Sequence, residues 1–136
     1  MNTREIENNI IEKLKTSFPE VLVQGFPDKP SQFTLLHPIG ALLVHYQGSS
    51  YTNTQALSFI TQENTKEFSV TVITRHLRDN NGAYEYIDKV KSVLSGFSID
   101  ECTSLKPTKD YFISENAGIW QYGINFTLKT QNIQTI

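Results

Sequence analysis

Three histidines and one cysteine are the side chains of this sequence best suited to bind a metal or act as nucleophiles. His37, His45 and His76 are far apart in the chain, and none forms the close paired spacing that zinc sites show. Two of them fall on separate predicted strands, where a histidine with a local hydrogen bond is the simpler interpretation. Cys102 has no positively charged neighbour nearer than Lys106, so nothing close to it in sequence lowers its thiol pKa. We expect no metal, no cofactor and no catalytic thiol.

Acidic residues and a lysine raise one further enzymatic possibility, a small metal-dependent nuclease. Asp28 follows Pro27, and Glu63 and Lys66 come later in the chain. The nuclease pattern also needs an acid-x-Lys unit on a strand, which is absent, and Glu63–Lys66 is better interpreted as a polar loop tip. The sequence has no phosphate-binding glycine pattern and no G-x-S-x-G elbow. We therefore expect a protein that is not an enzyme.

Composition indicates one folded domain over residues 1–136. Hydrophobic residues make up 38% of the chain and charged residues 19%, which are ordinary values for a globular protein. The formal net charge is −2 and the 12 Lys and Arg are scattered, so no basic face predicts specific nucleic-acid binding. No apolar run is long enough to cross a bilayer. The polar start, MNTREIENN, is unlike a secretory signal, and a single cysteine forms no internal disulfide.

Two helices are predicted by apolar residues that recur every three or four positions. Residues 3–17 place Ile6, Ile10 and Leu14 on one stripe, with Asn2 or Thr3 as cap, and Pro19 prevents continuation. Glu7 falls within that apolar arc and is either a carboxylate at the rim or an acid buried at a subunit interface. The second helix spans Gly82–Ser95, with Asp79, Asn80 or Asn81 as its cap and Gly96 as a left-handed stop.

Strands are predicted by alternating or continuous apolar runs, and the segments between them by turn residues. The stretch Phe68–Leu77 alternates an apolar side with a polar side that carries Ser69, Thr71, Ile73 and Arg75. Gly48–Asn53 is predicted as a turn, Gly25–Gly40 as an irregular connection and Gln131–Ile136 as a frayed tail. The other expected strands are Val21–Gln24, Ala41–Gln47, Thr54–Glu63, Glu101–Leu105, Lys109–Ser114 and Trp120–Lys129.

The order of these elements predicts an α+β fold with a single, mainly antiparallel sheet and two α-helices packed on one face. Short connections join most of the strands, which favours antiparallel pairing, and the helices each carry one apolar stripe that must be covered. The stretch Glu67–Phe97 combines a strand, a turn and a helix. We expect it to be the scaffold that holds out the loops.

Several short blocks in a fixed order carry a resemblance to a known family. They are the helix IENNIIEKLK, the strand ALLVHYQGSSY, the segment TQALSFITQ, the strand EFSVTVITRHLR, the helix GAYEYIDKVKSVLSGF and the closing WQYGINF. Together they resemble the Mu-type phage tail terminator, or tail completion, family over about Ile6 to Thr130. The likeness depends on order and spacing, since no single signature carries it.

The resemblance implies a structural protein of the virion tail, made in the cytoplasm of the bacterial host. Such a protein is expected to form a homo-oligomeric ring, usually a hexamer, on the head-proximal end of the tail tube. The ring ends tube polymerisation and offers a surface to the neck, or head completion, protein. The partners implied are thus copies of itself, the tail tube protein and the neck protein, with no membrane and no specific nucleic-acid binding.

Two segments are the expected contact surfaces, because they are long and polar while the predicted core is compact. Gly48–Lys66 is the first and the Pro27–Pro38 connection is the second. A sheet edge that pairs across subunits is a third possibility. Aromatic residues with polar tips are enriched at interfaces. The candidate interface residues are Tyr51, Gln55, Gln62, Glu63, Lys66, Phe33 and Glu7.

Two other functions stay open at this point. A neck or head-tail adaptor protein of the same phage module would share the fold and bind the capsid connector instead of the tube. The small metal-dependent nuclease is the second alternative, and activity lost in an Asp28→Ala variant would support it.

Overall fold

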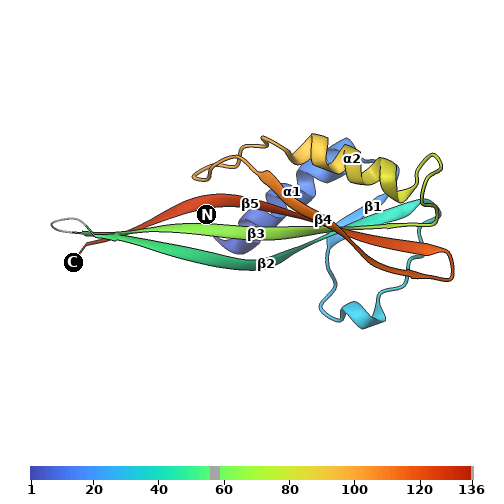
Figure 1. Ribbon diagram of the computed structural model, residues 1–136, viewed down its shortest axis with the longest axis horizontal. Coiled ribbons are helices and arrows are strands. Elements are labelled where there is room, and N and C mark those ends of the chain that lie inside the picture. Colours follow the sequence, from blue (N-terminus) through green and yellow to red (C-terminus); the bar gives the residue numbers. More distant parts are fainter. Residues whose placement is uncertain (56–58, 136) are drawn as a thin grey trace.

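A computed structural model describes residues 1–55 and 59–135, with the backbone alone described at 53–55, 59–62 and 131–135. It contains one five-stranded sheet in the order β1-β2-β3-β5-β4, with two α-helices on one face (Figure 1). This is the predicted α+β class. The elements in chain order are α1 (Thr3–Ser17), β1 (Leu22–Gly25), η1 (Pro30–Gln32, a short 3₁₀ turn), β2 (Gly40–Gln55), β3 (Phe59–Thr74), α2 (Ala83–Leu94), β4 (Lys106–Asn116) and β5 (Ile119–Thr135).

Helix α1 begins and ends where the sequence predicts. The Asn2 side chain accepts from the Glu5 backbone N–H at 2.8 Å, and the Glu5 carboxylate accepts from the Asn2 N–H at 3.3 Å. This reciprocal capping box satisfies two N–H groups that the first turn leaves without helical partners. The buried stripe is Ile6, Ile10, Ile11 and Leu14.

Helix α2 has a different cap from the predicted one. Its N-cap is Gly82, which provides no side-chain hydrogen bond, and the Glu85 carboxylate accepts from the Asn81 N–H instead. Glycine is required here because a Cβ on Gly82 would lie 2.7 Å from the carbonyl oxygens of Leu77 and Asp79. The predicted caps, Asp79, Asn80 and Asn81, were therefore wrong. Gly96 does take a left-handed φ of 80° after the helix, as predicted.

Strands β2 and β3 are longer than predicted, and they include both segments that the sequence predicted to be a turn or a loop tip. Gly48–Asn53 continues β2 after a register shift between Tyr46 and Gly48, and Glu63–Lys66 lies inside β3. The prediction of a turn and a polar tip was wrong because small polar residues suit turns locally, whereas pairing with a neighbouring strand decides their conformation here. Two long strands thus replace the three that were expected between residues 41 and 77.

The remaining strands also depart from prediction at their ends. Glu101–Leu105 forms no strand, and β4 begins at Lys106 and includes Pro107, which an edge strand tolerates. The expected frayed tail continues β5 to Thr135, paired with Phe59 of β3. Strand β1 is parallel to β2 while every other pair is antiparallel, so the sheet is mainly antiparallel as expected.

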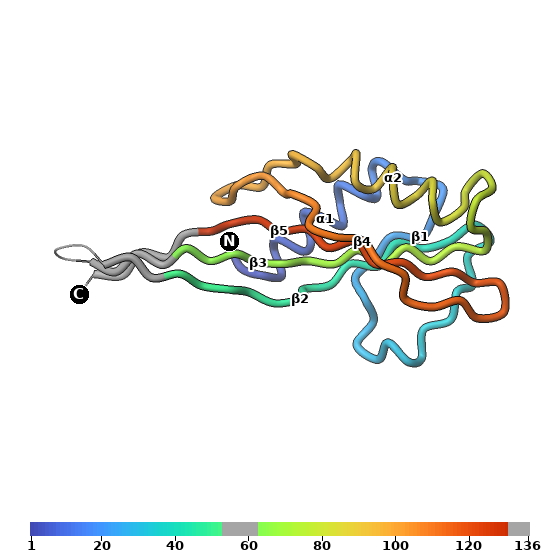
Figure 2. Tube along the Cα trace, viewed as in Figure 1, coloured from blue at the N-terminus to red at the C-terminus, as the bar shows by residue number. Residues whose placement is uncertain are grey.

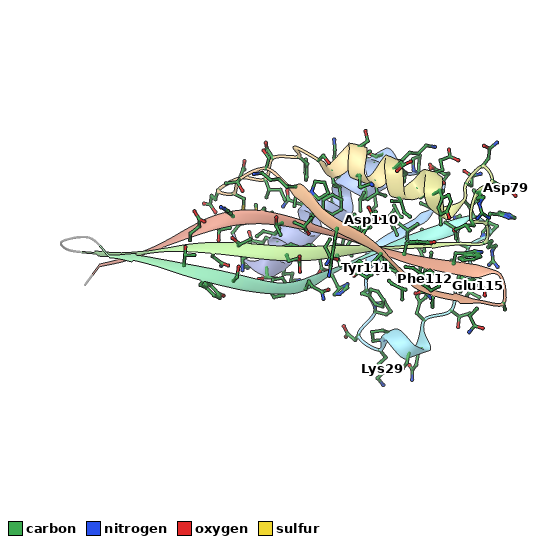
Figure 3. All side chains as sticks on the ribbon, viewed as in Figure 1. Lys29, Asp79, Asp110, Tyr111, Phe112 and Glu115 are labelled. Atoms are coloured by element: carbon green, nitrogen blue, oxygen red, sulfur yellow. The ribbon has the colours of Figure 1, made fainter. Side chains whose placement is uncertain are left out.

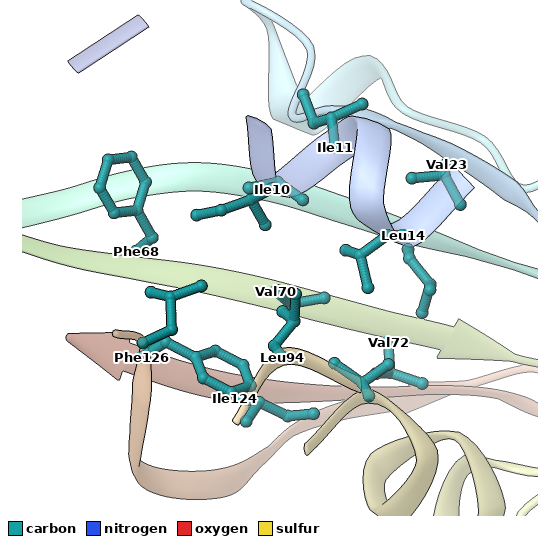
Figure 4. Packing of buried hydrophobic residues seen from close by; sticks show 14 of the residues in the cluster. Ile10, Ile11, Leu14, Val23, Phe68, Val70, Val72, Leu94, Ile124 and Phe126 are labelled. Carbon is teal, nitrogen blue, oxygen red and sulfur yellow. The ribbon is translucent and has the colours of Figure 1, made fainter. Parts of the chain in front are cut away.

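The main core lies between the helices and the sheet face that they cover. Figure 4 shows Ile10 and Leu14 of α1 and Leu94 of α2 among the side chains of β3 and β5. All of these are essentially inaccessible to water, and each such burial stabilises the fold by about 1.5–3 kcal/mol. The sheet contributes Leu42, Val44, Phe68, Val70, Val72, Ile124, Phe126 and Leu128 to this cluster.

The opposite face of β3 is also buried between Ser69 and Ile73, where the alternation had predicted a half-buried strand with one polar side. Ser69 and Thr71 are 1% and 3% exposed. A second apolar cluster lies on this face, and Phe26 and Phe33 from the β1–β2 connection pack against it. Figure 2 shows this connection on the side away from the helices. The members of the second cluster are Leu35, Ala41, Leu43 and Ile73.

Candidate interaction site

The histidines and the cysteine that opened the sequence search have local roles. His37 Nδ1 accepts from the Ile39 N–H at 3.1 Å, and His45 Nε2 lies 3.0 Å from Gln47 Oε1. His76 lies 4.0 Å from Asp79 at the bend before α2. Within the part of the chain that the structure describes, no three His, Cys, Asp or Glu residues could together hold a metal ion. Burial raises the pKa of the Cys102 thiol, which disfavours the nucleophilic thiolate.

The residues of the nuclease hypothesis each have a separate environment. Asp28 is exposed on the β1–β2 connection, whereas Glu63 and Lys66 lie on β3. Glu63 pairs with Lys129 at 3.0 Å, and Lys66 Nζ donates to Thr3 Oγ1 at 3.3 Å. Lys66 Nζ also lies 5.5 Å from the centre of the Tyr46 ring. Lys66 therefore ties β3 to the start of α1.

The most distinctive feature of the molecule is a three-stranded projection of the sheet, called the arm here. It comprises Gly48–Gln55 of β2, Phe59–Glu67 of β3 and Thr127–Thr135 of β5, paired in one antiparallel register. Figure 1 shows these strands extending past the ends of both helices. The base of the arm is held by Thr3 of α1 through Lys66 and by Thr103, whose N–H donates to the Lys129 carbonyl oxygen at 2.9 Å.

Where its side chains are described, the arm is mostly polar on both faces. Among its residues with described side chains, Asn64 and Leu128 are the buried ones. Its charges are Glu63, Glu67, Lys66 and Lys129, which balance to zero. A ribbon of this kind is held by its backbone ladder and gains little from apolar burial. Polar strands with two open faces also specify their pairing weakly and accept new strands readily.

Most of the predicted interface residues are brought together on this arm. Tyr51 is 57% exposed and lies opposite Asn64. Glu63 is exposed and its partner Lys129 is on the adjacent strand, whereas Lys66 is held at the base. In the outer part of the arm, Gln55 pairs with Ile60 and Gln62 pairs with Asn53. The side chains of Gln55 and Gln62 lie outside the described part of the structure.

The two other predicted interface residues lie on the body of the molecule. Phe33 follows η1 and packs half-buried against the second cluster, so its role in this chain is to hold the connection on the sheet. Glu7 is half-buried on α1, and a Cβ on Gly25 would lie 3.0 Å from its Oε1. Partial burial raises the pKa of the Glu7 carboxyl, and the nearby His45 and Arg4 oppose that rise.

A row of aromatic side chains at the opposite end of the molecule was not singled out from the sequence. Phe112 of β4 lies edge-on to Trp120 and Tyr122 of β5, with ring centres 6.3 Å and 5.6 Å away. Tyr122 in turn meets Tyr84 of α2, and Phe112 is 54% exposed. Figure 3 shows Phe112 and Glu115 at the end of the sheet away from the arm. The alternation of Trp120 and Tyr122 was visible in sequence, but their meeting with β4 and α2 was not.

This architecture defines a small α+β protein with a compact body and one projecting β-arm. The Gp37 protein family model matches residues 10–136, so the chain belongs to the Gp37 family, which is phage-associated. The phage association that the sequence resemblance implied is thereby confirmed. No curated protein matches the chain. Among the described residues, no helix is both long and apolar enough to cross a membrane.

Proposed function

We propose that this chain is a structural phage protein of the tail, which assembles as a ring on the head-proximal end of the tail tube. The ring, expected to hold six copies, ends tube polymerisation and presents a surface to the neck protein. Membership of a phage-associated family and the sequence resemblance to tail terminators support this proposal. The assignment is to assembly by shape, without catalysis.

The arm is the single observation that carries the proposal. The body buries apolar side chains on both faces of the sheet, so it needs no partner to complete its core. The arm adds long strands that carry no net charge and, among their described side chains, bury only Asn64 and Leu128. Such a projection contributes little to the stability of one copy, and it is well placed to contact another. Rings form when a surface of one copy meets a different surface of the next.

The chain's charge also suits a ring around a channel. The formal net charge is −2, and the two Lys of the arm are balanced by its two Glu. A protein that grips DNA neutralises phosphates with a basic surface, and the resulting binding weakens steeply with salt. A nearly neutral ring lets DNA pass without holding it.

The test measures molar mass by size exclusion with multi-angle light scattering, for the chain alone and mixed with the tail tube protein. We expect a discrete oligomer alone or on the tube, and tube lengths that stop growing when the chain is added. A matched control replaces residues 51–64 by an Asn-Gly turn and ends the chain at Thr130. Ser50 and Thr65 face each other in register, so a two-residue turn can join them.

The arm-shortened control should keep its helical circular dichroism and stay monomeric, because the body retains its core. A wild-type chain that stays strictly monomeric and binds no tube would overturn the proposal. Binding to the capsid connector in place of the tube would favour the alternative function, a neck or head-tail adaptor protein.

A further inference from the structure

The two long sides of the arm are open sheet edges. Strand β1 pairs with β2 only at Ala41–Val44, and β4 pairs with β5 only up to Thr127. Within the described residues, no strand covers the outer side of β2 from Gly48 to Gln55 or of β5 from Leu128 to Thr135. The two edges lie on opposite sides of the same ribbon, and Thr103 occupies the β5 edge at Lys129, so the open stretch of β5 is Thr130–Thr135.

The hydrogen bonds at Lys129 reveal which backbone groups point outward. Its N–H donates to Thr103 Oγ1 at 2.8 Å and its carbonyl oxygen accepts from the Thr103 N–H, so the Lys129 backbone faces away from β3. Alternation along antiparallel strands then directs Leu128 and Thr130 toward β3.

The same alternation also sets the direction of the backbone N–H and C=O groups in β3 and β2. Leu128 and Thr130 pair with Lys66 and Asn64, so these two β3 residues direct their backbone groups to β5. Their neighbours Glu63 and Thr65 direct theirs to β2, where they meet Thr52 and Ser50. The N–H and C=O groups of Ser49 and Tyr51 consequently point out of the sheet, without a strand to receive them.

The arm edges lack the features by which proteins protect exposed strands, and β4 has them. Strand β4 carries Lys106, Pro107 and Lys109 and shifts register twice, at Pro107/Lys109 and at Phe112/Ser114. Lysine, proline and bulges on an edge all discourage strand addition. The arm edge of β2, GSSYTNTQ, has no charge and no proline, and Thr130–Thr135 of β5 has neither.

We infer that the arm edge of β2 in one copy pairs through its backbone with the arm edge of β5 in the next copy. The inference rests on the proposed ring and names its contact. Both strands run antiparallel to β3, so they run in the same direction. Rotation about an axis along the arms preserves that direction, and the pair between copies is therefore parallel. Because the edges are different, the contact is heterologous and repeats around a closed ring.

The occupant of each edge is a second copy of this chain, on two grounds. Neither Gly48–Gln55 of β2 nor Thr130–Thr135 of β5 carries a charged side chain, so pairing brings no like charges together, and each copy supplies one edge of each kind. A peptide from another protein would fill one edge and leave the other open. Main-chain hydrogen bonds provide the affinity in this mode of recognition.

Proline at an outward position tests the pairing without breaking the arm. Ser49→Pro/Tyr51→Pro removes two outward N–H groups, whereas the β2–β3 ladder uses those of Ser50 and Thr52. Ser49→Ala/Tyr51→Ala is the matched control, since it removes the same side chains and keeps both N–H groups. We expect the proline variant to dissociate at protein concentrations at least ten-fold higher than wild type, and the alanine variant to stay within three-fold.

Hydrogen exchange gives an independent readout of the same contact. Amides of residues 48–52 that exchange rapidly in dilute monomer should become protected in the assembled wild-type chain, and to the same degree in the alanine variant. Circular dichroism of both variants checks that the body stays folded. If the wild type never assembles, alone or on the tube, both the proposed ring and the proposed pairing of edges are overturned. If it assembles, and the proline variant assembles equally well with these amides unprotected, the pairing alone is overturned.

Discussion

The body and the arm of this protein use the same three strands in two different ways. In the body, Val70 and Thr71 are neighbours on β3 and both are buried, because helices cover one sheet face and the β1–β2 connection covers the other. In the arm, the same strand includes Glu63 and Lys66, whose partners are also polar. Glu63 pairs with Lys129, and Lys66 donates to Thr3. The body is stabilised within one copy, whereas the arm presents unpaired backbone. Stability and assembly are therefore separable by substitution.

The largest expected effect comes from a cavity in the body. Leu14 of α1 is fully buried in the main core, and Leu14→Ala should lower the free energy of unfolding by about 2–5 kcal/mol. Urea unfolding followed by circular dichroism measures the change. Light scattering at low temperature should still find the wild-type oligomer, because the arm edges are unchanged. Loss of the oligomer in a variant that remains folded would contradict the prediction that stability and assembly can be changed separately.

A smaller effect is expected on the back of the sheet, where an aromatic ring covers a glycine. A Cβ on Gly123 would lie 2.5 Å from Cζ of Tyr111, whose hydroxyl donates to Asn125 Oδ1 at 3.2 Å. Gly123→Val must displace this ring, and overpacking of this kind costs about 1–3 kcal/mol. Thermal unfolding measures it. Tyr111→Phe, which keeps the ring and removes only the hydrogen bond, should lose about 1 kcal/mol. Equal losses in the two variants would contradict the steric explanation.

The helices and the fold class could be predicted from the sequence because their signals are local. Periodic apolar residues, Asn2 as cap and Gly96 as stop all lie within the elements that they define. The long strands could not be predicted in the same way. Gly48–Asn53 has turn chemistry, and only its pairing with β3, distant along the backbone, keeps it extended. Burial of Ser69 was equally hidden, since the cover on that face comes from the irregular connection and from other strands.

The candidate site was found in part for the same reason. The sequence indicated that Gly48–Lys66 was long and polar, and the structure places its described residues, 48–55 and 59–66, on the arm. The third strand of the arm was missed because Gln131–Ile136 is polar and terminal, which is typical of a frayed tail. Without β5 the second open edge could not be inferred. The aromatic row was missed because its rings come from three separate elements.

The smallest expected effect concerns Glu7, which lies on α1 near the point where β1 ends. Burial raises the pKa of its carboxyl from the ordinary 4.5, so the folded chain holds this proton at a pH where the unfolded chain has released it. Stability is then fully present below pH 4.5 and falls as pH rises through the folded-state pKa. Glu7→Gln removes the ionisation, and the free energy of unfolding should decrease less between pH 4.5 and 7 than in wild type.

Urea unfolding at several pH values measures this slope, with Glu12→Gln as a control that removes an exposed charge from the same helix. The comparison also decides to which region Glu7 belongs. A carboxyl at the rim of the body should show the same pH dependence in monomer and oligomer. A carboxyl buried further by a neighbouring copy should show a steeper dependence in the oligomer, because added desolvation raises the pKa again. The neighbours of Glu7 within one copy favour the first result, since a Cβ on Gly25 would lie 3.0 Å from its Oε1.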